Sequence, residues 1–170
     1  MAIASCLVHT NILLRMVRRS DSQHQVVDAA LARLAGQGTI LHYTHQNVAE
    51  LWNATTGPVV RNGFGLSAAE AEREVRAIEA GMSFLPDSEA LYREWRRIVL
   101  QYGVLGVQVD DARLAAAMYV HSVGHILVEC DGLHPLQRSY RHASGQHPLA
   151  GLALDERECD LQATEKGEPV

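Results

Sequence analysis

Near the start of the chain lies the run Ile3-Ala4-Ser5-Cys6-Leu7-Val8, which is followed directly by His9-Thr10-Asn11. The run is mostly apolar and too short for a helix, so it predicts a strand buried on both faces, as in a parallel sheet. The polar residues after it fall at the carboxyl end of that strand, where α/β proteins place their ligands. This stretch therefore indicates both the fold class and the edge of the sheet that carries the functional site.

Outward from this stretch, segments of the two kinds alternate. Further strands are predicted over residues 39–43, 83–85, 107–109 and 125–128, and helices over 12–17, 22–35, 45–55, 67–80, 88–102 and 110–123. Thr44 is a predicted N-cap, Ser67 and Glu70 form a capping-box pattern, and Asp110 or Asp111 is expected to cap the last helix. This order predicts an α/β protein, a three-layer α/β/α sandwich around a central and mostly parallel sheet.

The end of the sequence differs in kind from the rest. Residues 129–170 are rich in His, Gly, Gln and Pro and follow no helical or strand period. We therefore expect a single domain over residues 1–128 and a loop-rich tail over 129–170. Two alternatives stay open for that tail, a folded segment and a sequence altered by a change of reading frame.

Composition limits the classes of protein to which the chain can belong. Its 170 residues suit one domain, and no apolar stretch reaches the roughly 18 residues of a membrane helix. The N-terminus lacks the basic region and long apolar run of a signal peptide, so we expect a cytoplasmic protein with no membrane association. The net charge of −5 argues against non-specific coating of nucleic acid.

Several acidic residues are placed to meet at the carboxyl edge of the predicted sheet. Asp111 follows the strand expected over 107–109, Glu50 lies in the helix after 39–43, and Asp131 follows the last strand. Carboxylate oxygens gathered in this way are the ligands that Mg²⁺ and Mn²⁺ prefer. Such an ion can activate water and offset the charge of a phosphodiester. Spacing alone leaves another interpretation open, because Asp111 can be a simple helix cap and Glu50 a solvated side chain.

Three motifs in this order resemble those of the PIN-domain family, and in particular ribonucleases of the VapC toxin type. The motifs are Leu7-Val8-His9-Thr10-Asn11-Ile12-Leu13-Leu14, Thr44-His45-Gln46-Asn47-Val48-Ala49-Glu50-Leu51-Trp52-Asn53 and Asp110-Asp111-Ala112-Arg113-Leu114-Ala115-Ala116-Ala117-Met118. His125-Ile126-Leu127 is similar to the start of the family's final strand, so the likeness covers residues 3–127.

The resemblance implies a metal-dependent endoribonuclease that hydrolyses RNA phosphodiesters. Glu50, Asp111 and Asp131 would then be ligands of Mg²⁺ or Mn²⁺, and His9, Thr10 and Asn11 would complete the catalytic site. It also implies a homodimer and, for toxin members, inhibition by a small antitoxin protein.

The chain departs from the family pattern at position 9, where the family has its first aspartate and this chain has His9. We rank three consequences: a disabled site, a changed metal preference and a general base. The sequence after Leu127 also departs from the family's ending. The alternative hypothesis is therefore a catalytically impaired PIN-like protein that binds RNA or a protein partner.

Overall fold

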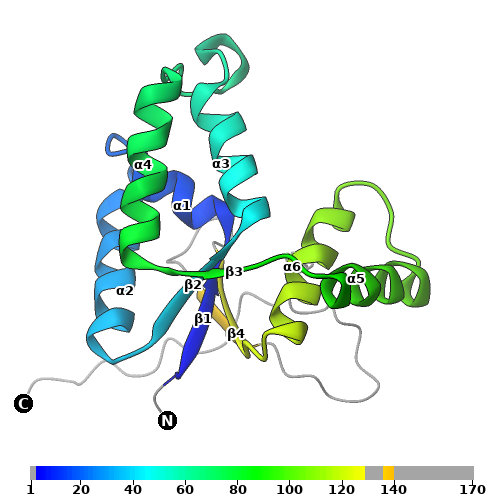
Figure 1. Ribbon diagram of the computed structural model, residues 1–170. Coiled ribbons are helices and arrows are strands. Elements are labelled where there is room, and N and C mark those ends of the chain that lie inside the picture. The colour runs from blue at the N-terminus through cyan, green and yellow to red at the C-terminus, as the bar shows by residue number, and fades with distance from the viewer. Residues whose placement is uncertain (1–2, 129–135, 140–170) are drawn as a thin grey trace, which may run out of the picture.

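A computed structural model of the chain describes residues 3–128 and the backbone of residues 136–139. Within that part, the chain forms one sheet with helices on both sides (Figure 1). The strands are β1 (Ser5–Val8), β2 (Ile40–Thr44), β3 (Ser83–Leu85), β4 (His125–Val128) and β5 (Leu136–Ser139), in the order β3-β2-β1-β4-β5. The pairs β1–β2, β1–β4 and β2–β3 are parallel, whereas β5 pairs antiparallel with β4.

The helices divide between the two faces of the sheet (Figure 1). On one side lie α1 (Thr10–Val17), α2 (His24–Gly36), α3 (His45–Thr56) and α4 (Ala68–Gly81), with the short 3₁₀ helix η1 (Val59–Arg61) beyond α3. On the other side lie α5 (Glu89–Tyr102) and α6 (Gln108–Val120). This arrangement confirms the predicted three-layer α/β/α sandwich.

The side chains of β1 supply both hydrophobic cores. Cys6 and Val8 pack into the cluster of α1–α4, whereas Leu7 packs into the cluster of α5 and α6. This follows from the strand period of two, which turns successive side chains to opposite faces. Because all three side chains are fully buried, the alternation fixes the register of the central strand.

The helix starts that the sequence predicts are confirmed in three places. Thr44 caps α3 and Ser67 caps α4, each in a capping box with the residue three positions later. Ser88 caps α5 through its side chain, and that helix ends at Gly103, whose φ of 61° is left-handed. The caps satisfy backbone donors that the first helical turn leaves without a partner.

The prediction of a strand over residues 107–109 is wrong. Those residues form the entry to α6, which begins at Gln108, with the Gly106 carbonyl accepting from the Val109 amide at 3.2 Å. A short apolar run does not by itself distinguish a strand from a helix. Residues 107–109 pair with no strand of the described sheet. Asp110 and Asp111 consequently lie inside the first turn of α6 and do not cap it.

The sheet extends beyond the last strand that the sequence indicates. That strand was expected to be His125–Val128, yet β5 pairs with it through residues that we assigned to the tail. Pairing gives partners to backbone groups along one edge of β4. Residues 129–135 and 140–170, and with them most of the expected tail, lie outside the described residues. No helix in the described part of the chain has the length and apolar character needed to cross a membrane.

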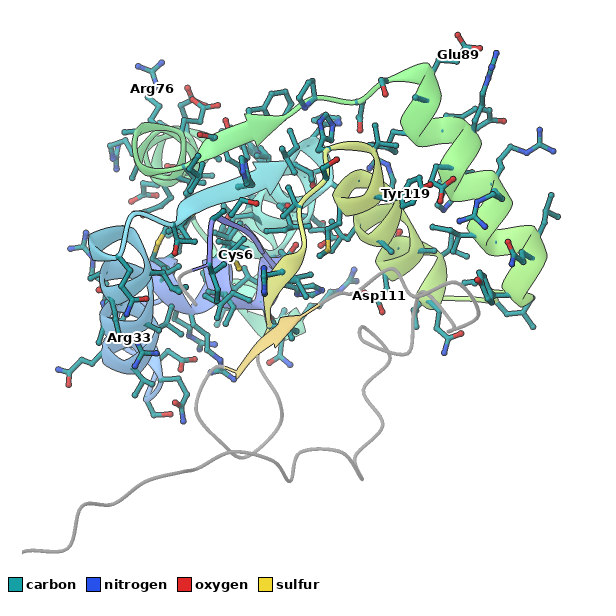
Figure 2. The ribbon with its side chains drawn as sticks, turned by 90° about the horizontal axis from the view of Figure 1, so that it is seen from below. Cys6, Arg33, Arg76, Glu89, Asp111 and Tyr119 are labelled. Carbon is teal, nitrogen blue, oxygen red and sulfur yellow. The ribbon has the colours of Figure 1, made fainter. Side chains whose placement is uncertain are left out.

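The burial of Cys6 gives a test of the central strand, on which Figure 2 labels this residue. Burial raises the pKa of the Cys6 thiol to about 12. In a variant with Cys130→Ser and Cys159→Ser, Cys6 is the remaining cysteine. At about pH 8 we expect no alkylation of the folded protein by iodoacetamide, and complete alkylation in denaturant, because the thiolate is the reactive form. Mass spectrometry measures the modification, and equal labelling in both conditions would contradict the assignment.

Candidate functional site

The site lies where the chain leaves β1 and β2. These strands pair in parallel with Leu7 opposite His42, so their carboxyl ends lie side by side. The chain passes from β1 through His9 into α1, and from β2 directly into α3. The His9 amide donates to the Leu127 carbonyl at 2.9 Å, which ties this exit to β4 as well. The ends of β1 and β4 therefore fix the backbone at position 9, and β2 ends beside β1.

A buried polar chain connects these two exits. The Asn47 side chain accepts at Oδ1 from both the backbone amide and the hydroxyl of Thr44, each at 2.8 Å, and its Nδ2 donates to Thr10 Oγ1 at 3.0 Å. The Thr10 hydroxyl in turn donates to Glu50 Oε2 at 2.5 Å. Thr10, Thr44 and Asn47 are all buried. Thr10 has a single hydroxyl proton, and it donates this proton to Glu50. The hydrogen bond therefore holds the Glu50 carboxylate in one orientation.

Gln46 contacts the same carboxylate from the first turn of α3. Its Nε2 donates to Glu50 Oε1 at 2.7 Å and to the Asp110 carbonyl at 3.1 Å. Both oxygens of Glu50 are thus hydrogen-bonded, and α3 is joined to the first turn of α6. Glu50 and Asp111 come from different helices, and Gln46 is a direct link between those helices.

His9 and Asp111 form the second half of the site. His9 Nε2 lies 3.7 Å from Asp111 Oδ1, and both side chains are partly exposed. His9 is also the N-cap of α1, because its Nδ1 accepts from the backbone amide of Asn11 at 3.2 Å. An acceptor nitrogen carries no proton, so the neutral ring has its proton on Nε2. The nitrogen that faces Asp111 therefore has no lone pair for a metal ion. Figure 2 shows Asp111 at the start of α6.

The side chains fit a divalent ion only in part. Within the described residues, no group of three His, Cys, Asp or Glu side chains is arranged to hold a metal ion. Glu50 and Asp111 are nevertheless hard oxygen donors, and Mg²⁺ can bind through one or two carboxylates while it keeps several waters. Among the described residues, the donor set therefore offers two carboxylates, Glu50 and Asp111, to a hydrated ion.

The structure pairs the predicted residues as Thr10 with Glu50 and His9 with Asp111. Asn11 contributes its backbone amide to the His9 cap, and Asp131 lies outside the described residues. Gln46 and Asn47 were not among the predicted site residues. Their positions four and three residues before Glu50 place them on the same side of α3, and this spacing is the signal that could have found them.

Removal of the Asn47 side chain should destabilise the fold. In Asn47→Ala, the buried amide and hydroxyl of Thr44 lose their acceptor, and the expected loss is about 1–3 kcal/mol in the free energy of unfolding. Asn53→Ala makes the same change at an exposed position of α3 and should stay within about 0.5 kcal/mol of the unsubstituted protein. Urea denaturation followed by circular dichroism measures both. Equal stability of the two variants would show that the Asn47 hydrogen bonds do not stabilise the fold.

Comparison with known proteins agrees with this architecture. The family model "PIN domain" matches residues 6–131. The fold is similar to VapBC2 from Rickettsia felis, solved bound to a DNA fragment from their promoter, with 13% identity and a TM-score of 0.52 over 70% of this chain and 83% of that one. It is also similar to VapC20 from Mycobacterium tuberculosis, a Sarcin-Ricin loop cleaving toxin, with 12% identity and a TM-score of 0.55 over 71% and 86%. A search of curated proteins gives no significant match. The matched family model spans well over half of the sequence, and the chain belongs to the PIN-domain family.

Proposed function

We propose that this protein is a VapC-like PIN-domain endoribonuclease that hydrolyses phosphodiester bonds of structured RNA. The observation that carries the proposal is the fixed carboxylate of Glu50, which is held by Thr10 and Gln46 at the strand exits, with Asp111 on the neighbouring helix. An acid that is pre-oriented by its own hydrogen bonds costs little reorganisation when substrate arrives. The similarity of the fold to an RNA-cleaving toxin supports the same substrate class.

Glu50 and Asp111 would hold Mg²⁺ or Mn²⁺, which would activate water and offset the negative charge of the phosphodiester. Thr10 and Gln46 keep Glu50 in place, and Asn47 keeps Thr10 in place. His9 caps α1 and presents Nε2–H toward Asp111. Asp131 is retained as a third acidic residue in this proposal.

The proposal includes partners. The similarity to VapBC2, a toxin–antitoxin assembly, supports a small antitoxin protein that covers the site, and the family resemblance supports a homodimer. In this proposal RNA is the substrate, and the protein meets RNA and the antitoxin in the cytoplasm.

A second candidate function follows from His9. Its Nδ1 is occupied by the helix cap, and its Nε2–H faces Asp111, so position 9 supplies neither a carboxylate nor a free lone pair toward that acid. This geometry favours a PIN-domain protein that binds RNA or a protein partner without cutting RNA. The two candidates differ in whether two carboxylates are enough for catalysis.

Cleavage of a structured RNA in the presence of Mg²⁺ or Mn²⁺ separates them. We expect the natural protein to cut, His9→Asp to cut faster, and Asp111→Ala to lose about 100-fold or more in rate, because the lost charge stabilisation is worth several kcal/mol. Gel analysis of end-labelled RNA measures the rates. Asp28→Ala, which removes a half-exposed acid from α2, is the matched control and should leave the rate unchanged.

The pattern of activities decides between the candidates. If only His9→Asp cuts, the scaffold is a nuclease silenced at position 9, and the binding function holds for the natural chain. If none of the proteins cuts, the assignment of Glu50 and Asp111 as the hydrolytic site is refuted.

A further inference from the structure

The carboxamide of Gln46 is oriented by two acceptors. Its Nε2 lies 2.7 Å from Glu50 Oε1 and 3.1 Å from the Asp110 carbonyl oxygen. Exchange of the nitrogen and oxygen positions would place three acceptor oxygens together with no proton between them. The network therefore fixes which atom is nitrogen and which is oxygen.

This orientation leaves the amide oxygen without a partner. Among the described residues, Gln46 Oε1 is the one buried side-chain nitrogen or oxygen that makes no hydrogen bond, and only 6% of Gln46 is exposed. A buried acceptor without a donor is destabilising, so such atoms call for a physical explanation. By contrast, the neighbouring side chains Thr10, Thr44 and Asn47 are all hydrogen-bonded.

The unpartnered oxygen belongs to a side chain that contacts the acidic site through its nitrogen. It is bonded to the same carbon as Nε2, which contacts Glu50 directly and the backbone one residue before Asp111. Carboxamide oxygens are hard, neutral donors that bind divalent cations or their coordinated waters. Position 9, from which the PIN-family resemblance leads us to expect an acidic oxygen, supplies an imidazole in this chain.

We propose that Gln46 is a further residue of the site, and that its Oε1 is an oxygen donor to the hydrated divalent cation bound by Glu50 and Asp111. In this role Gln46 adds an oxygen at a site that has lost the one expected at position 9. The inference rests on the proposed function for the presence of a cation. It gives a role to Gln46, a residue of the second motif to which the family resemblance assigned none.

The test measures binding of Mn²⁺ alone, without RNA, by electron paramagnetic resonance of the free ion. Gln46→Met preserves the length of the side chain and removes both amide atoms. We expect its Kd for Mn²⁺ to rise by about 10- to 100-fold, the usual effect of removing a group that supports a metal site. Gln25→Met makes the same change at an exposed position of α2 and should bind Mn²⁺ as the natural protein does.

Gln46→Glu separates a role of the oxygen from a role of the nitrogen. This variant keeps an oxygen and adds charge, but it loses the N–H groups that contact Glu50 and Asp110. If Oε1 binds the cation or its water, Gln46→Glu should bind Mn²⁺ at least as tightly as the natural protein. If Gln46 acts only through its nitrogen, both variants should weaken binding, and the inference is overturned. Unchanged binding in Gln46→Met also overturns it.

Thermal unfolding with and without Mn²⁺ gives an independent readout and shows whether each variant folds. Should Gln46→Met fail to fold, Gln46→Asn, which is one methylene shorter, carries the same expectation of weaker binding. Failure of the proposed metal site can be distinguished from failure of the Gln46 inference, because the natural protein itself would then show no Mn²⁺ binding. Failure of the Gln46 inference alone leaves that binding intact.

Discussion

The central position of β1 is the constraint on which the rest of the structure depends. The strand has a parallel neighbour on each edge and a hydrophobic core on each face, and Cys6, Leu7 and Val8 are fully buried. A shift of one residue in the pairing of β1 would turn each of its side chains to the opposite face of the sheet. The register of β1 is therefore fixed. The position of Thr10, which is two residues beyond the strand, is thereby fixed next to α3.

The polar network at the strand exits converts this rigidity into an oriented carboxylate. Each link from Thr44 through Asn47 and Thr10 to Glu50 lies in a region with little access to water, where an unpaired polar group is costly. Such a network stabilises one arrangement of its members and penalises partial ones. Gln46 departs from this rule at a single atom, and that atom belongs to the residue that joins Glu50 to the helix of Asp111.

The sequence predicted the elements whose signals are local, such as the caps at Thr44 and Ser67 and the buried run before His9. It failed at residues 107–109, because a short apolar run becomes a strand only where a neighbouring strand can pair with it. β5 was missed for the converse reason: the edge of β4 recruits residues that carry no strand period of their own. The motifs that resemble the PIN-domain family led us to predict Glu50 and Asp111 as site residues. The role proposed for Gln46 depends instead on its contact with Asp110, 64 positions away in the chain.

Position 9 carries an imidazole where the family resemblance leads us to expect an acid, and the fold is kept. The residue there caps α1, and the family resemblance leads us to expect that it also supplies negative charge beside Asp111. An aspartate side chain can perform both, since a carboxylate oxygen also accepts from the first-turn amides. The imidazole performs the first through Nδ1 and leaves the second undone, because its other nitrogen carries a proton toward Asp111. The helix start is therefore insensitive to the exchange, and its effect falls on the electrostatics of the site.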